Sequence, residues 1–235
     1  MAQIKKSTLT FLKKLAKNNN RDWFQENKKV YEAARENVIE FADALLEKLR
    51  ETDVLETENG KKSLYRIYRD VRFSKNKLPY KTNFAGGFKR DGKLRRGGYY
   101  FHLTPTGTAN DFVGNSVVGG GFYGMESHDL KRVREEIAAS ADDFREVMAD
   151  PEFIRVFGEM QGEKLKTAPK GFDREHPDID LLRYKQFYAM RSFNDQQVTS
   201  AEFLDLSHEA MVTLRPFFDL FTEVLTTDAN GEVVV

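Results

Sequence analysis

The stretch NFAGGFKRDGKLRRGGYYFHL, residues 83–103, decides the fold class. Residues 83–88 and 99–103 have the aromatic-rich composition and the short apolar period that are typical of β-strands. Asp91-Gly92 between them is a hairpin-turn signal. Strands that are joined by a short turn pair antiparallel. The stretch therefore predicts an antiparallel sheet in the middle of the chain.

Helical patterns flank this stretch on both sides. Before the stretch, helices are predicted over 7–17 and 23–49. After it, strands are predicted over 112–118 and 186–193, and helices over 127–140, over 141–149 and from Pro151. A last helix is predicted from a capping box at Thr199 to Thr226, and Pro216 should kink or split it. The segment 64–73 is ambiguous, and we favour a strand or an irregular segment. We expect one α+β domain over residues 1–235, an antiparallel sheet packed by long N- and C-terminal helices.

The charge of the chain is unevenly distributed. Lys plus Arg and Asp plus Glu each number 37, so the formal net charge is zero. Residues 66–96 nevertheless hold eleven Lys/Arg and only two acids, a net charge of +9, and the remainder must carry −9. A concentrated positive field on a neutral protein indicates that an anion is held or attracted there.

The densest part of this basic segment, residues 68–82, predicts an anion site. Arginine offers a planar fork for carboxylate or phosphate, and lysine a mobile point charge. The candidate anion contacts are Arg66, Arg69, Arg72, Ser74, Lys75, Lys77 and Lys81. Asp70 lies between Arg69 and Arg72, so it either orients a guanidinium or acts as a catalytic base. The alternative is an Arg–Asp network that only fixes a loop against the sheet.

Three classes of function are compatible with this pattern. The first is a pocket for a phosphate- or carboxylate-bearing small molecule, with or without catalysis. The second is a nucleic-acid-binding module that uses the basic hairpin 89–96 and the aromatic residues after it. The third is a protein-interaction scaffold whose oppositely charged halves pair. We favour the first, and we interpret 89–96 as a solvated hairpin whose charge merely adds to the field.

Two other motifs are less specific. The run Gly119 to Gly121 lacks the Gly-Lys-Ser/Thr of a P-loop, and triple glycine more often permits close backbone packing than phosphate binding. The loop 171–183 gathers His176 and several carboxylates, but their spacing matches no metal motif. Its carboxylates could pair with the basic segment, which would make the loop a lid or a strut. The sequence predicts no metal and leaves the cofactor undetermined.

Composition also bears on compartment. The chain has no cysteine, which excludes disulfides, thiolate metal sites and cysteine nucleophiles. No apolar run is long enough to cross a bilayer, so no membrane partner is expected. Lysines interrupt the N-terminal apolar patch, and it therefore lacks the apolar core of a signal peptide. We expect a cytoplasmic protein.

Several motifs together resemble a bacterial and fungal family, domain of unknown function family 2461. They are the basic stretch 68–82, NNNRDWF at 18–24, GGGFY at 119–123, GFDREHPD at 171–178 and LLR at 181–183. The resemblance spans nearly the whole chain and implies a single domain, but no established activity, cofactor or catalytic residue. Asn76 stands where the family commonly has an acid, and Leu78 where it commonly has a small hydroxyl residue.

Overall fold

The structure is a computed structural model that describes residues 2–72, 76–92, 94–108, 114–228 and 230–234. Its helices are α1 (Lys6–Lys17), α2 (Arg21–Glu26), α3 (Lys28–Arg50), α4 (Gly60–Ser63), α5 (Ser127–Ala139), α6 (Asp142–Ala149), α7 (Pro151–Phe157), α8 (Ile179–Leu182), α9 (Asp195–Val198), α10 (Phe203–Val212) and α11 (Arg215–Thr226). Its strands are β1 (Phe84–Lys89), β2 (Gly98–Leu103), β3 (Ser116–Phe122) and β4 (Phe187–Phe193).

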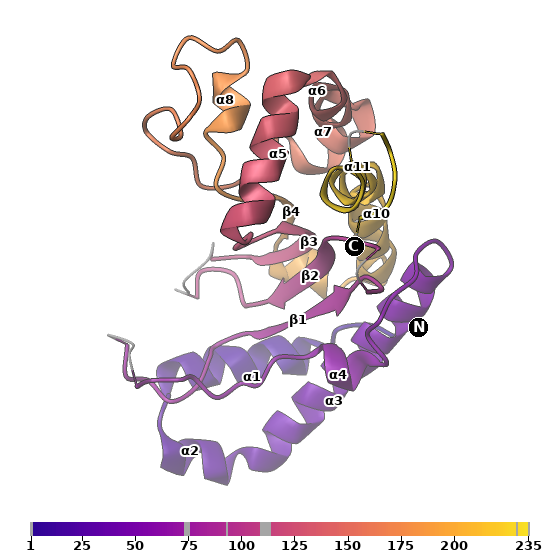
Figure 1. The fold of residues 1–235 in the computed structure, drawn as a ribbon. Helices are drawn as coiled ribbons and strands as arrows, with labels where there is room; N and C mark the ends of the chain where they lie inside the picture. Colours follow the sequence, from indigo (N-terminus) through magenta and orange to yellow (C-terminus); the bar gives the residue numbers. More distant parts are fainter. Residues whose placement is uncertain (1, 73–75, 93, 109–113, 229, 235) are drawn as a thin grey trace. The chain divides into compact units, whose positions relative to one another are not determined.

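The four strands form one antiparallel sheet in the order β1-β2-β3-β4, with helices before and after it in the chain (Figure 1). The α+β prediction is therefore confirmed. Contacts divide the chain into two compact units, and the division passes through all four strands. Unit 1 is Met1–Phe88, Tyr100–Val118 and Ser192–Glu209, and unit 2 is Lys89–Tyr99, Gly119–Arg191 and Ala210–Val235. The expectation of a single domain stays a prediction.

Unit 1 has an aromatic core built on the long helix α3. Phe41 of α3 is fully buried, and its ring stacks on Phe203 at 5.1 Å. The ring of Phe101 in β2 packs edge-on against the Phe41 ring, with 6.3 Å between the ring centres. Helices α1 and α4 both pack against α3, as Figure 1 shows. Burial of these large rings supplies much of the stability of this unit.

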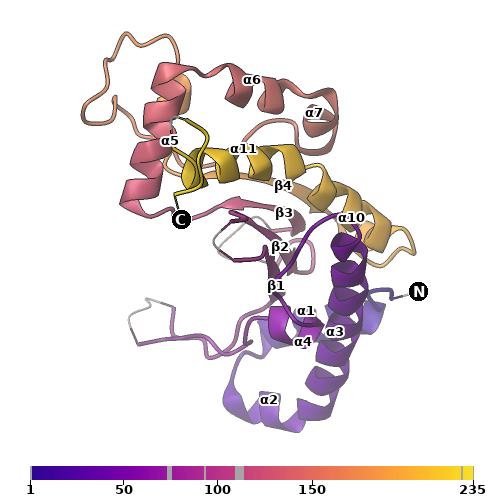
Figure 2. The same ribbon diagram turned by 45° about the vertical axis from the view of Figure 1, so that its right-hand side comes forward.

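Unit 2 has a second aromatic core around α11. Phe221 of α11 is fully buried, and its ring lies 4.6 Å from Phe122 of β3 and 5.1 Å from Phe187 of β4. Phe144 of α6 meets the same ring edge-on at 5.6 Å. Helix α6 also packs beside α11 (Figure 2). The C-terminal helix is thus anchored by rings from both the strands and the helices of its own unit.

Several predicted boundaries require correction. The helix expected over 23–49 is interrupted at Asn27, which ends α2 and whose side chain bonds back to Trp23 O. The capping box expected at Thr199 is instead formed by Asn194 and Gln197 at the start of α9, and the Thr199 hydroxyl bonds Asp195 O. Pro216 does split the last helix, because a proline is tolerated only in the first turn of α11.

Candidate anion-binding site

The predicted anion site is carried by a β-ribbon that extends the edge of β1 within unit 1. Leu64 pairs with Gly86 and Tyr68 with Tyr80, both antiparallel. The backbone N–H of Arg69 donates to Pro79 O at 2.9 Å. The segment 64–69 is therefore extended, as the sequence analysis favoured, and it is held by backbone hydrogen bonds.

The ribbon contains a bulge opposite Arg66. Tyr65 N donates to Ala85 O at 2.9 Å, and Lys81 N donates to Ile67 O at 2.8 Å. One residue, Arg66, separates Tyr65 from Ile67, whereas the three residues 82–84 separate Lys81 from Ala85 on the facing strand. Extra residues in one strand bend it and re-aim its side chains. The bulge thus sets the directions of Arg66 and Lys81.

Polar contacts support the strand 80–82 of the ribbon. The Asn19 side chain accepts from Tyr80 N at 3.1 Å and donates to Tyr80 O at 3.0 Å, which continues the strand pairing on the other side. The buried Thr104 hydroxyl donates to Thr82 O at 3.4 Å. These contacts give the Asn-rich motif at 18–20 a structural role, since Asn20 also caps α2.

Three cations converge on this ribbon, and we call Arg66, Arg69 and Lys81 the cation cluster. Lys81 is half-buried, and burial, Arg66 and Arg69, in that order, lower the pKa of its ammonium group. Among the described residues, neither Arg66 nor Lys81 forms a salt bridge. Like charges held together repel one another, so the cluster is an arrangement that an anion would stabilise.

An aromatic strip accompanies the cation cluster within unit 1, and it consists of Tyr65, Tyr100 and His102. The Tyr65 ring lies 6.0 Å from Lys81 Nζ and 6.4 Å from the Tyr100 ring. The Tyr100 hydroxyl lies 3.2 Å from Nδ1 of the buried His102, within hydrogen-bonding distance. Burial, followed by Lys81, lowers the pKa of His102 to about 4. His102 is therefore neutral near pH 7.

The remaining predicted residues lie nearer the tip of the ribbon. Arg72 donates to both carboxylate oxygens of Asp70, at 3.1 and 2.7 Å, and the two side chains are exposed. This contact and then the backbone N–H of Arg72 lower the pKa of Asp70, so its carboxylate is a weak proton acceptor. Lys77 Nζ donates to Val71 O at 2.9 Å. Ser74 and Lys75 lie outside the described residues.

We expected the basic hairpin 89–96 to be solvated. This prediction is wrong for two of its arginines, Arg90 and Arg96. Arg90 is almost fully buried in unit 2, and its guanidinium donates to Asp219 at 2.6 Å and to Arg96 O at 2.9 Å. Arg96 pairs with the buried carboxylate of Asp129. These two arginines are poorly placed to contact a nucleic acid, because acids of unit 2 already hold them.

The loop 171–183 and the glycine run have structural contacts. Arg145 of α6 binds Asp178 at 2.8 Å and Asp180 at 2.9 Å, so these carboxylates pair with α6 and not with the basic segment. The loop is accordingly a strut within unit 2. A Cβ on Gly119 would lie only 2.0 Å from Ala189 O, which explains the glycine run by close strand packing.

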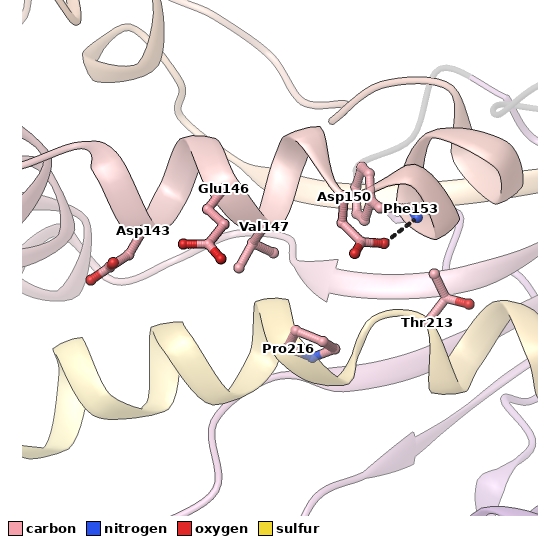
Figure 3. Close-up of a pocket in the computed structure, with 7 residues that line it drawn as sticks. All are labelled: Asp143, Glu146, Val147, Asp150, Phe153, Thr213 and Pro216. Atoms are coloured by element: carbon pink, nitrogen blue, oxygen red, sulfur yellow. Dashed lines mark hydrogen bonds between the residues drawn. The ribbon is translucent and has the colours of Figure 1, made fainter.

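Neither of two cavities in the described part of the chain is lined by the cation cluster. One, of about 250 Å³, lies between α6, α7 and the start of α11 in unit 2 and is lined by Asp143, Glu146 and Asp150 (Figure 3). Its acidic lining suits no anion, and Asp150 caps α7 by accepting from Glu152 N and Phe153 N. The other, of about 320 Å³, lies between α1 and α9 in unit 1. No group of acids and histidines in the described residues is arranged to hold a metal.

The sequence named Arg66, Arg69 and Lys81 among seven candidate anion contacts, but it did not indicate that these three converge or that Tyr65 and His102 lie beside them, and it assigned Tyr100 to the hairpin 89–96. Tyr100 and His102 are two residues apart in β2, and alternation along a strand places such residues on one face. That signal was present in the sequence. The proximity of this face to Lys81 depends on the bulge, which no local pattern announces.

The fold and the site together define an α+β protein with a basic ribbon at the edge of its sheet. The chain matches the family described as "Conserved hypothetical protein (DUF2461)" over residues 7–220, and it belongs to that family. The resemblance is thereby confirmed. No curated protein and no solved structure matches the chain. In the described part of the chain, no helix has both the length and the apolar character needed to cross a membrane.

Proposed function

We propose that the protein binds a phosphate- or carboxylate-bearing molecule at the cation cluster. The observation that carries this proposal is the position of Lys81, a half-buried residue held on the hydrogen-bonded ribbon near Arg66 and Arg69, and burial and these two arginines lower its pKa. Confining like charges costs free energy, and proteins keep such arrangements mainly where a bound anion offsets the cost. Lys81 and the two guanidiniums would contact the anionic group.

The aromatic strip supports the same proposal. Neutral His102 and the Tyr100 hydroxyl add hydrogen-bonding groups beside the cations without adding a competing negative charge. We do not expect the exposed Asp70 and Arg72 to contact the anion, because the Arg72 guanidinium already donates two hydrogen bonds to the Asp70 carboxylate. The proposal concerns binding, and catalysis is not part of it.

The test is a titration of the full chain with inorganic phosphate, sulfate and citrate, followed by thermal denaturation. Lys81→Gln removes one cation at nearly constant size, and Lys61→Gln, at an exposed position of α4, is the matched control. An anion at one hundred times its Kd should stabilise the wild type and Lys61→Gln by about 2.7 kcal/mol. Lys81→Gln should lose most of this gain. Equal stabilisation of Lys81→Gln and wild type by every anion would refute the proposal.

A further inference from the structure

We infer that the ligand of the cation cluster is a nucleoside phosphate, whose phosphate contacts the cations and whose base stacks on Tyr65. This inference rests on the proposed anion binding and adds the class of ligand. It also moves any nucleic-acid contact from the hairpin 89–96 to the ribbon 64–86.

The exposure of Tyr65 is the first argument. Large aromatic side chains are mostly buried in soluble proteins, yet Tyr65 retains 54% of its accessible surface. The backbone that carries this ring is nevertheless fixed, because the Tyr65 N–H donates to Ala85 O beside the Leu64–Gly86 pair. A half-exposed ring on a hydrogen-bonded strand is a pre-organised surface for stacking.

The neighbours of this ring are the second argument. Lys81 Nζ lies 6.0 Å from the centre of the Tyr65 ring, at the limit of a cation–π contact. An anion on Lys81 would therefore lie close to the Tyr65 ring. A single sugar separates the phosphate from the base in a nucleotide, so one such ligand can reach both the ammonium group and the ring.

The Tyr65–Tyr100 pair narrows the mode of binding. The two ring centres are 6.4 Å apart and the planes are inclined by 33°. That spacing leaves no room for a third ring between them without movement, so we expect the base to stack on the face of Tyr65 that is turned away from Tyr100. The Tyr100 hydroxyl lies beside His102 and adds a hydrogen-bonding group near the ring pair. Stacking of this kind tolerates any base, and it contributes to nucleotide binding wherever aromatic and basic residues alternate.

The experiment compares three probes by isothermal titration of the full chain: inorganic phosphate, ribose 5-phosphate and AMP. Wild type should bind AMP about ten-fold more tightly than ribose 5-phosphate, since stacking of one base supplies that difference. Tyr65→Leu should abolish the difference, and it should change the Kd of inorganic phosphate far less than the Kd of AMP. Tyr65→Phe should preserve the difference, because it keeps the ring. Tyr123→Leu, at an exposed tyrosine of unit 2, is the matched control.

The outcomes separate the two levels of the proposal. Phosphate and ribose 5-phosphate that bind while AMP binds no better would overturn the nucleotide inference and leave anion binding intact. No binding of any probe would overturn both. A Tyr65→Leu variant that weakens inorganic phosphate as much as AMP would show that the ring only shapes the cluster, and it would also overturn the inference. A 5′-phosphorylated oligonucleotide is the last probe. If it binds more tightly than AMP, the natural ligand is a nucleic-acid strand. If it binds no more tightly than AMP, the natural ligand is a free nucleotide.

Discussion

The ribbon 64–86 and the hairpin 89–96 are both rich in lysine and arginine, but their charges are used in opposite ways. In the hairpin, acids from distant parts of unit 2 meet the arginines: Asp219 binds buried Arg90, and Asp129 binds Arg96. In the ribbon, Lys81 instead lies near Arg66 and Arg69, and its pKa is lowered by burial and then by these two charges. The comparison teaches that charge density alone does not identify a binding surface. What distinguishes Arg90 and Arg96 from Arg66 and Lys81 is that, among the described residues, only the first two have a carboxylate partner.

The largest expected effect is a loss of stability on mutation of Arg90 in the hairpin 89–96. Arg90→Ala removes a guanidinium that binds Asp219, donates to Arg96 O and lies 5.4 Å from the Phe218 ring. Breaking a buried ion pair costs about 3–5 kcal/mol, and the lower value is expected here because water can hydrate the half-exposed Asp219. Urea denaturation followed by circular dichroism measures the loss. Lys89→Ala, at the exposed neighbouring position, serves as control, and a loss below about 1 kcal/mol for Arg90→Ala would break the comparison.

The next effect concerns pH and the strip beside the ribbon. The pKa of His102 is about 4 in the folded protein, whereas an unfolded histidine titrates near 6.5. Between these values the unfolded state binds more protons, so stability is full above about pH 6.5 and falls as pH decreases towards 4. The shift corresponds to a loss of about 3 kcal/mol, which His102→Gln should remove from the pH dependence of the unfolding free energy. Identical pH profiles for wild type and His102→Gln would place the imidazole outside the buried environment described.

The smallest effect is expected at Asp70. Both members of the Asp70–Arg72 pair are exposed, and exposed ion pairs contribute little to stability. Asp70→Asn should therefore change neither the denaturation midpoint nor the affinity for inorganic phosphate measurably. A marked loss of phosphate binding would instead extend the site from the cation cluster to the tip of the ribbon.

The fold could be predicted from local patterns. The different roles of the two basic regions, one structural and one proposed for binding, could not. Strand alternation around Phe101 and the turn at Asp91-Gly92 indicated the antiparallel sheet, and helical spacing located most helices. Asp219, the carboxylate that binds Arg90, is 129 residues away in the sequence, so no local pattern predicts this pair. The convergence of Arg66 and Lys81 was equally hidden, since it depends on three residues that bulge opposite one. Composition identified where charge gathers, whereas tertiary pairing determines which charges remain for a ligand.

The most direct test measures stability with and without phosphate for two variants, Lys81→Gln and Arg90→Gln. We expect Lys81→Gln to be at least as stable as the wild type in the absence of phosphate, because it relieves repulsion by Arg66 and Arg69, and to lose the stabilisation that phosphate gives. Arg90→Gln should be destabilised in its absence and should keep the full increment on addition of phosphate. The opposite pattern, a destabilised Lys81→Gln that still responds to phosphate and a stable Arg90→Gln that does not, would contradict the assignment of the ribbon to binding and the hairpin to structure.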